Sequence, residues 1–515
     1  MIRFTNSIKL VGIDGAIVTV ECNVIESGVG IHLVGLADAA VKESLLRTVT
    51  ALQAYGFSFP GSKIVINLAP ADLAKSATGY DLPMALTIIA ASGQHDLNYL
   101  DRFLVIGELG LDGTVREVNC CVQAVEAAID AGLKGVIIPK TNGVEVARIF
   151  ANTIPVYPVS NLGEAIDVVS GNDVIPTAWD EYLNGPVKDV ANKCAWDKDV
   201  LNAAARRALE IAAAGGHHMA LMGPPGSGKY AIASALVELL PQLSANEAID
   251  VARVYSAAGL GAYRALQNKA YQRPFRAQIY NMSLTAFAGG GTGETIKPGE
   301  ASLASKGVLF IEEANKMPKS LSRILEDAMQ EKQVTVARLK SKVTFPTDFQ
   351  FIAGIEPCPC GYYGEGDHCK CTTEQRMEWN STITSKPWMS KIDMQVWVHP
   401  GDVRYNLKPE ERESVEVVAE RVRLAREMQA RRFRGRTDIR LNADMKDADT
   451  HLYCPLTDEC IELVNRIMER LNLSSDAGLP MLRVARTIAD LDGCDMLLPR
   501  HIAEAASYRF LDRRA

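Results

Sequence analysis

The order of apolar and polar positions divides the chain into three regions and a linker. In residues 1 to 168, short β-rich runs ("AIVTVECNV", "KIVINLAP", "KGVIIPK") alternate with alanine-rich runs of helical period ("DLPMALTIIAASG"). Residues 169–199 lose this periodicity and collect Gly, Pro, Asn and Asp, which is typical of a linker. Strand and helix patterns resume over 200–405, and 406–515 is mainly helical. The pattern therefore predicts an α/β protein with an α+β domain, an α/β core and a helical C-terminal domain.

Composition and charge narrow the class of protein. The 515 residues carry a formal net charge of −7, which argues against a uniformly basic nucleic-acid-binding protein but allows a local positive channel. No apolar run reaches the ~18 residues of a membrane span, and the first residues do not read as a secretion signal. The 11 cysteines are scattered through the chain, as expected of reduced thiols. We therefore expect a cytoplasmic protein that does not enter a membrane.

The segment "LMGPPGSGKY" carries the strongest chemical pattern. A strand ending at Met222 precedes a glycine-rich loop and a helix, which is the context of the phosphate-binding pattern G-x-x-x-x-G-K-[ST]. Loop N–H groups surround a phosphate there and Lys229 neutralises it, so ATP with Mg²⁺ is the expected ligand. The residues expected to bind it are Gly223, Pro224, Pro225, Gly226, Ser227, Gly228, Lys229 and Tyr230. The alternative is a Gly/Pro turn that binds nothing.

Two acidic residues end the apolar strand in "KGVLFIEE". In P-loop enzymes one carboxylate at this place anchors magnesium and a second one activates water, roles that Glu312 and Glu313 would fill. Acidic pairs at strand ends are also common without a function. The position of this pair downstream of the loop favours the catalytic interpretation.

Four cysteines lie in the glycine-rich segment "CPCGYYGEGDHCKC". Cys358, Cys360, Cys369 and Cys371 form two C-x-C pairs that can place four thiolates around one ion, with His368 as a substitute ligand. The spacing is tighter than the usual C-x₂₋₄-C of zinc sites, so reduced thiols are the alternative. The hypothesis from the sequence is a structural Zn²⁺.

Two weaker patterns concern DNA and proteolysis. The arginine-rich run 421–440 could contact DNA phosphates, but a solvated helix face is the favoured interpretation. Lys75 and Ser76 are adjacent, and adjacent residues do not form a Ser-Lys catalytic dyad.

The chain resembles the magnesium-chelatase-like AAA+ ATPases of the competence protein ComM (YifB) family along nearly its whole length. The resemblance is carried by "VGLADAAVKESLLR", "INLAPADL", "YDLPMAL", "GELGLDGTVREV", "RALEIAAAGGHH", "GPPGSGK", "RPFRA", "PGEASLASKGVLF", "CPCGYYG" and "VARTIADLDG". It implies an N-terminal domain of Lon-protease-like fold, an AAA+ core and a helical lid. It also implies a homo-hexameric ring that uses ATP to work on DNA during natural transformation.

Five positions depart from the family's catalytic pattern. Tyr230 replaces the magnesium-binding Ser or Thr, Glu312 replaces Asp, and Glu356 replaces an Asn that senses the terminal phosphate. Lys391 stands where the family carries an arginine finger, and Asp476 stands where it offers a sensing arginine. Because the loop lysine is kept while its helpers change, the resemblance implies ATP binding with weakened hydrolysis.

Other functions stay open at this stage. One is a nucleotide-binding scaffold subunit that does not hydrolyse ATP, which the five substitutions favour. Another is the ATPase subunit of a magnesium chelatase, which the additional N-terminal 168 residues disfavour. The same substitutions would also be found in a sequence altered or designed on this family's fold.

Overall fold

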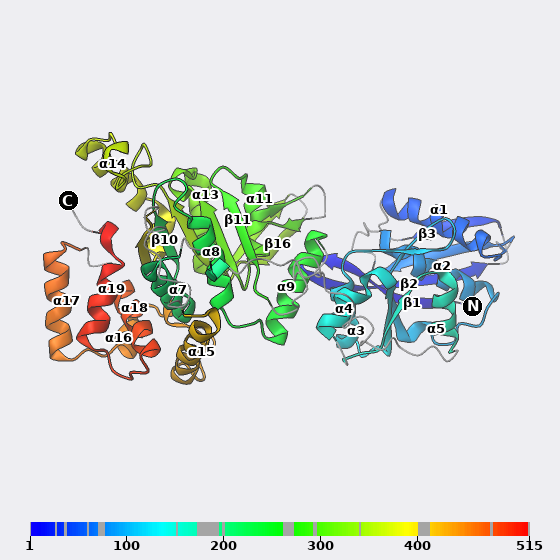
Figure 1. The fold of residues 1–515 in the computed structure, drawn as a ribbon. Helices are drawn as coiled ribbons and strands as arrows, with labels where there is room; N and C mark the ends of the chain where they lie inside the picture. Colours follow the sequence, from blue (N-terminus) through cyan, green and yellow to red (C-terminus); the bar gives the residue numbers. More distant parts are fainter. Residues whose placement is uncertain are drawn as a thin grey trace.

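The fold contains two large β-sheets and a C-terminal bundle of helices. The computed structural model describes residues 2–25, 28–34, 39–58, 61–70, 78–150, 153–171, 195–197, 201–260, 272–291, 296–338, 341–399, 413–473 and 477–512. The core sheet lies between the N-terminal sheet and the helical bundle (Figure 1). The alternation of strands and helices therefore gives an α/β fold, as the sequence predicts.

The N-terminal sheet has seven strands in the order β3-β4-β2-β1-β5-β8-β9. β1 pairs antiparallel with β2, and β2 pairs antiparallel with β4, while the other neighbours are parallel. The strands are β1 (Arg3–Val11), β2 (Asp14–Ile25), β3 (Gly30–Val34), β4 (Lys63–Ala69), β5 (Phe103–Val105), β8 (Gly135–Pro139) and β9 (Val156–Val159), with a small hairpin of β6 (Glu108–Leu109) and β7 (Val115–Arg116) beside them.

Helices cover both faces of this sheet because its strands alternate between two sets of apolar side chains. In β4, Ile64, Ile66 and Leu68 are buried and face one cluster, whereas Leu104 of β5 and Val136 of β8 face the other. The first cluster is closed by α1 (Ala39–Ala54), α2 (Asp81–Ser92) and α5 (Leu162–Ser170), and the second by α3 (Cys121–Asp130) and α4 (Gly143–Phe150).

The core sheet is fully parallel, in the order β11-β14-β17-β10-β18. Buried parallel strands read as continuous apolar runs, and all four residues of β10 are buried. The strands are β10 (Met219–Met222), β11 (Phe275–Ile279), β14 (Val308–Glu312), β17 (Gln350–Ile355) and β18 (Met394–Trp397). The side chains of Met219 and Leu221 pack toward α7 and α8, and those of Ala220 and Met222 pack toward the opposite helices.

The helices next to the glycine-rich loop begin and end at residues with the expected local chemistry. The first helix begins at Ala203, because the Asn202 side chain accepts a hydrogen bond from the Ala205 N–H at 2.8 Å and caps it. This helix is α7 (Ala203–Gly215). α8 (Lys229–Leu239) begins at the loop lysine, after Gly228 in the left-handed conformation with φ 83°.

Short elements surround the core sheet, and longer helices form the bundle. Around the sheet lie α9 (Ala245–Ala258), α11 (Leu284–Ala288), α12 (Glu300–Leu303), α13 (Lys319–Glu331), α14 (Thr373–Thr384) and the strand pairs β12 (Gly289–Gly290) with β13 (Lys297–Pro298) and β15 (Gln333–Arg338) with β16 (Ser341–Pro346). The bundle is α15 (Val415–Arg432), α16 (Asp447–Tyr453), α17 (Asp458–Arg470), α18 (Gly478–Leu491) and α19 (Pro499–Ser507). One apolar cluster joins α7 and α8 to this bundle.

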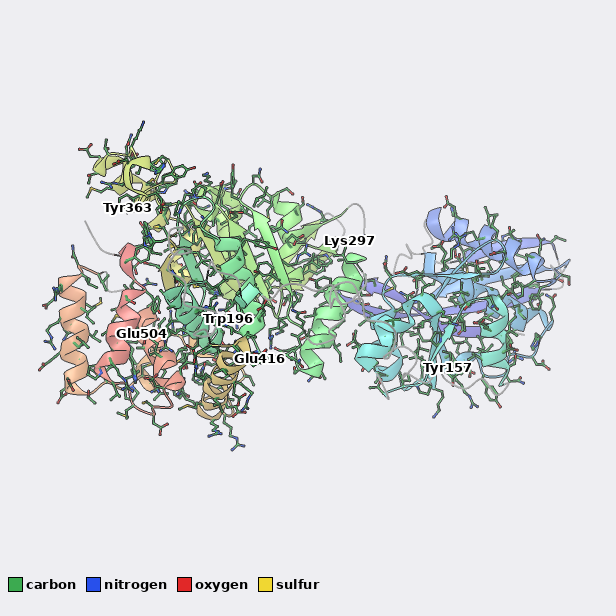
Figure 2. All side chains as sticks on the ribbon, viewed as in Figure 1. Tyr157, Trp196, Lys297, Tyr363, Glu416 and Glu504 are labelled. Atoms are coloured by element: carbon green, nitrogen blue, oxygen red, sulfur yellow. The ribbon has the colours of Figure 1, made fainter. Side chains whose placement is uncertain are left out.

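Part of the predicted linker is built into the core. Residues 195–197 form a short 3₁₀ turn, and Trp196 is 1% exposed. Its indole Nε1 donates to the Glu413 carbonyl at 3.0 Å, and the Arg206 guanidinium lies 4.6 Å from the ring centroid. Figure 2 shows Trp196 among the helices next to the core sheet. Residues 195–197 therefore pack against the core and do not behave as an exposed linker.

The N-terminal region contacts the core through α9. The Gln123 amide donates to the Arg253 carbonyl at 2.9 Å, and the Cys120 N–H donates to the Ser256 hydroxyl at 3.1 Å. Arg253 also forms an ion pair with Glu126 at 3.1 Å. Figure 1 shows α9 between the two sheets, so this helix joins them.

Within the described ranges, no helix is both long enough and apolar enough to cross a lipid bilayer.

Candidate nucleotide-binding site

The glycine-rich loop leaves the central part of the core sheet. It follows β10, which lies between β17 and β18, and the Gly223 N–H donates to the Ile355 carbonyl at 3.1 Å. Gly226 has φ 78°, a conformation that favours glycine, and a Cβ there would meet nothing within 4 Å. The loop is therefore open on the side where a ligand would approach.

Lys229 is folded into the loop. Its ammonium donates to the carbonyls of Gly223 and Pro224, both at 2.9 Å, and the residue is 5% exposed. Burial lowers the pKa of Lys229, whereas the carboxylates of Glu312, Glu356 and Glu313 act to raise it. The ammonium is thus a buried cation at the first turn of α8, held in the loop and surrounded by acids.

The loop also contains a polar group that a ligand could satisfy. The Ser227 hydroxyl is buried, and none of the described residues forms a hydrogen bond with it. An unpaired buried hydroxyl is costly, and a phosphate oxygen would pair it. Together with the Lys229 ammonium, this observation shows that the residues fit a phosphate.

Tyr230 lies outside the loop. Its ring is 52% exposed and packs edge-on against Phe275, at 5.6 Å between centroids, and against Phe310 at 6.2 Å. The ring therefore leans on β11 and β14, the strand that ends in Glu312. A phenol is too long to act as the small hydroxyl ligand that magnesium has in this pattern.

The acidic pair lies at the carboxyl end of β14. Glu312 ends the strand and is exposed, and Glu313 follows it in the left-handed conformation with φ 54°. Glu313 forms an ion pair with Lys316 at 3.0 Å. The candidate water-activating carboxylate is therefore already paired with a cation.

Lys316 also pairs with Glu356, at 2.8 Å. Glu356 follows β17, the strand next to β14. Its N–H donates to the Asn315 side chain at 3.4 Å, and its carbonyl accepts from the Trp379 indole at 2.9 Å. No sequence pattern singles out Lys316, although its position three residues after Glu313 allows an ion pair within one turn.

Lys391 lies at the amino end of the parallel strands, opposite the end that carries the loop. It ends a 3₁₀ turn (Pro387–Lys391) that precedes β18, whereas the loop follows the carboxyl end of the neighbouring parallel strand β10. Its ammonium donates to the Gln330 side chain at 2.9 Å, and it lines a cleft of about 1210 Å³ between the sheet and the bundle. The fold does not bring Lys391 to the loop of its own chain. Asp476 lies outside the described residues.

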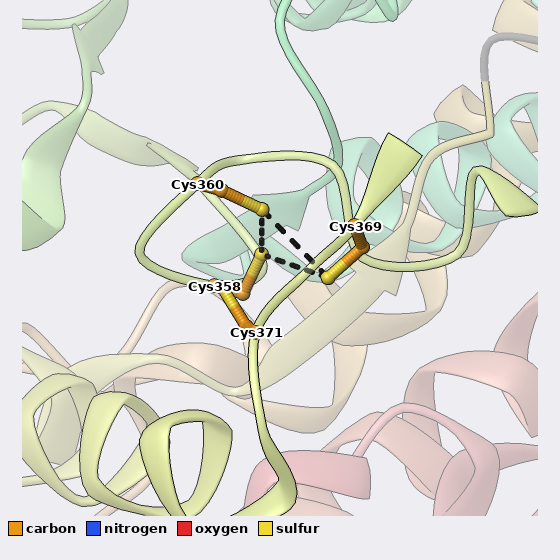
Figure 3. A group of neighbouring side chains, drawn as sticks. All are labelled: Cys358, Cys360, Cys369 and Cys371. Carbon is orange, nitrogen blue, oxygen red and sulfur yellow. Dashed lines mark hydrogen bonds between the residues drawn. The ribbon is translucent and has the colours of Figure 1, made fainter. Parts of the chain in front are cut away.

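The four cysteines come together at one place (Figure 3). The Sγ atom of Cys358 lies 3.3 Å from that of Cys360 and 3.8 Å from that of Cys369, and the last two are 3.7 Å apart. All four sulfur atoms, including that of Cys371, lie within 4.8 Å of one another. Four thiolates ~2.3 Å from a tetrahedral zinc ion are about 3.8 Å apart, so the geometry fits this metal.

The thiols of the cysteine cluster differ in their pKa values. A backbone hydrogen bond involving Tyr362 lowers the pKa of Cys360 to about 6, whereas burial raises the pKa of Cys358 to about 12. The His368 ring nitrogen Nδ1 lies 3.0 Å from the Glu365 carbonyl. The four cysteines could therefore hold a metal ion without the histidine.

The arginine-rich run is largely engaged within the chain. Arg421 pairs with Glu413 at 2.7 Å, and Arg432 pairs with Asp490 at 2.9 Å. The Arg426 guanidinium donates to the Ala213 carbonyl at 2.9 Å. The last two contacts join α15 to α18 and α7, whereas Arg423, Arg431 and Arg434 of the same run are exposed to solvent. Lys75 and Ser76 lie outside the described residues.

Family models match most of the chain. The model "Magnesium chelatase, subunit ChlI" matches residues 198–405, "Subunit ChlI of Mg-chelatase" matches 20–142, and "Magnesium chelatase, subunit ChlI C-terminal" matches 412–509. With the parallel sheet and the glycine-rich loop, they define the class as a magnesium-chelatase-like AAA+ protein.

Similar proteins give the family within this class. The chain is 35% identical to "Uncharacterized protein YifB" of Escherichia coli over 98% of this chain and 96% of that protein. It is 34% identical to "Competence protein ComM" of Haemophilus influenzae over the same shares. The chain belongs to the ComM/YifB family. A shorter similarity, 29% over 17% of this chain and 18% of its match, is to "DNA repair protein RadA" of Aquifex aeolicus.

Proposed function

We propose that this chain is a nucleotide-binding AAA+ protein of the ComM type that acts on DNA and hydrolyses ATP slowly. The observation that carries the proposal is the buried Lys229 ammonium in an open glycine-rich loop, beside the unpaired Ser227 hydroxyl. A buried cation next to unpaired polar groups is suited to a polyanionic phosphate.

Different residues of the site would bind the phosphates and the magnesium ion of the nucleotide. Backbone N–H groups of residues 223–229, the Ser227 hydroxyl and the Lys229 ammonium would hold the phosphates, and the exposed carboxylate of Glu312 would face Mg²⁺. When bound, ATP supplies the free energy for mechanical work and Mg²⁺ neutralises charge on its phosphates. Glu313 would orient water, provided that Lys316 releases it.

Three features argue for slow hydrolysis. Tyr230 provides no small hydroxyl for magnesium, and Lys316 pairs with the water-activating carboxylate of Glu313. Lys391, which would reach the nucleotide of a neighbouring subunit in a ring, lacks the planar fork of arginine. Loss of an arginine finger costs about 10³ to 10⁵ in rate in related phosphoryl-transfer enzymes.

The part of the proposal that concerns DNA rests on relatives. A family member is named a competence protein, and a shorter match is named a DNA repair protein. By the same similarity we propose a cytoplasmic homo-hexamer built from an N-terminal domain (1–168), a linker (169–199), an AAA+ core (200–405) and a helical lid (406–515). DNA would then contact the assembled ring, which agrees with arginines that are engaged inside one chain.

A second candidate function is a scaffold that binds nucleotide without turning it over. The Lys316–Glu313 ion pair favours it, because a paired carboxylate is a poor base. Calorimetric ATP binding and steady-state hydrolysis, each with and without DNA, separate the candidates. Slow turnover that DNA accelerates supports the first, binding with no turnover supports the second, and no binding contradicts both.

Replacing Tyr230 by Thr is expected to leave hydrolysis slow. The variant regains a magnesium hydroxyl, but Lys316 still pairs with Glu313, and Glu356 and Lys391 are unchanged. The rate of phosphate release, measured with DNA present, should stay within about tenfold of the parent rate, because these other substitutions still slow the reaction. Tyr230→Phe is the matched control and should equal the parent. Rapid hydrolysis by the parent, or its full appearance in Tyr230→Thr, would contradict this explanation.

A further inference from the structure

Lys316 connects two carboxylates that belong to different strands. It ends the 3₁₀ turn Ala314–Lys316 that follows β14, and its ammonium lies 3.0 Å from Glu313 and 2.8 Å from Glu356. The same ammonium lies 6.0 Å from the centroid of the Tyr280 ring. Burial lowers the pKa of Lys316, but its hydrogen bonds to Glu356 and Glu313 outweigh burial and raise that pKa above its usual range. Lys316 is therefore a cation held at the carboxyl ends of β14 and β17.

This cation lies beside the phosphate-binding loop. A Cβ on Gly361 would lie 3.2 Å from Pro225 of the loop and 3.7 Å from the Glu356 carboxylate. The loop and the carboxylate that Lys316 contacts thus meet around one glycine. Glu312, Glu356 and Glu313 also act electrostatically on Lys229, which places both lysines around one group of acids.

The charged side chains around the loop disfavour a phosphate as long as the Lys316 ammonium is engaged by its two carboxylates. The group holds two ammonium groups, of Lys229 and Lys316, and three carboxylates, of Glu312, Glu313 and Glu356. An arriving nucleotide brings further negative charge to a site where Tyr230 has removed one magnesium ligand. The side chain of Lys316 is 35% exposed, so it has room to turn toward an anion of higher charge than either carboxylate.

We propose that Lys316 is a second phosphate-binding lysine, which contacts the terminal phosphate and makes the site prefer nucleoside triphosphates to diphosphates. The inference rests on the proposed nucleotide binding and deepens it. Lys229 lies in the loop, whereas Lys316 lies outside it, in the turn after β14, where it pairs with Glu313 and Glu356. A diphosphate would leave Lys316 with its two carboxylates, and a triphosphate would recruit it.

The test compares affinities for a non-hydrolysable ATP analogue and for ADP by titration calorimetry. Lys316→Gln is expected to weaken the analogue by about 10-fold or more relative to ADP, as for a lost charged hydrogen bond. Lys319→Gln, an exposed lysine on the next helix, is the matched control and should keep the parent ratio. An unchanged ratio in Lys316→Gln overturns the inference.

A triple variant separates phosphate contact from simple neutralisation of the two carboxylates that Lys316 pairs with. In Lys316→Gln/Glu313→Gln/Glu356→Asn the cation and both of its partners lose their charge, so no unpaired carboxylate repels the ligand. If Lys316 contacts the terminal phosphate, the preference for the triphosphate stays lost. If the triple variant regains the parent ratio, Lys316 acts only on its carboxylate partners and the inference is wrong. A parent chain that binds neither ligand overturns the proposed function together with this inference.

Discussion

Replacing Lys229 by Ala is expected to abolish binding of ATP and ADP. The lysine ammonium is the buried cation of the loop, and three carboxylates, those of Glu312, Glu313 and Glu356, surround it. Without it, the phosphates would face these acids and unsatisfied loop carbonyls. Loss of a charged contact and the added repulsion should weaken binding by about 100-fold or more, which calorimetry would record as no measurable heat of binding.

The control for this experiment is a lysine outside the site. Lys319→Ala removes one positive charge from an exposed position at the start of α13 and should bind as the parent does. The midpoint of thermal unfolding, measured without nucleotide, shows whether Lys229→Ala remains folded. Equal dissociation constants for the parent and a folded Lys229→Ala variant would contradict the assignment of the loop.

Replacing Cys358 and Cys371 by Ser is expected to remove a bound zinc ion. Protein purified without chelator should contain about one zinc per chain, because the four thiols are already close enough for one tetrahedral ion. The free energy of zinc binding is coupled to folding, so the segment 358–371 should lose its order with the metal. Elemental analysis measures the metal, and hydrogen exchange of the segment measures its order.

A cysteine elsewhere provides the matched control. Cys494 lies in the bundle, outside the cluster, and Cys494→Ser should keep the full zinc content. A parent chain without zinc, in protein that has met no chelator, would support the alternative of four reduced thiols. Loss of zinc in Cys494→Ser would show that the metal lies elsewhere.

Local patterns predict the elements that carry the loop and the acidic pair. A continuous apolar run, a glycine-rich loop and a helix are adjacent in the sequence, and the structure has β10 and α8 at these places. β1 was harder to recognise because Thr5 and Ser7 interrupt its apolar pattern, although both are buried in the structure. Trp196 falls in the predicted linker for a similar reason, since its contacts come from distant segments.

The Lys316–Glu356 pair shows the limit of reading positions one at a time. In the sequence, Glu356 stands only as the replacement of a phosphate-sensing Asn, because its partner Lys316 is 40 residues away along the chain. The parallel pairing of β14 with β17 brings the two ends together, and Lys316 then neutralises the carboxylate. The negative charge that Glu356 adds is thus neutralised by Lys316, a partner that becomes evident only in the folded structure.

The indole of Trp379 gives the chain an internal optical reporter. It is carried by α14, which follows the cysteine cluster, and its N–H holds the Glu356 carbonyl at the edge of the nucleotide site. Indole emission depends on hydrogen bonding and on exposure to water. The emission of this indole is therefore expected to change when zinc is removed from the cysteine cluster and when a nucleotide binds at the proposed site. The difference between the parent and Trp379→Phe spectra isolates this signal from that of the other tryptophans.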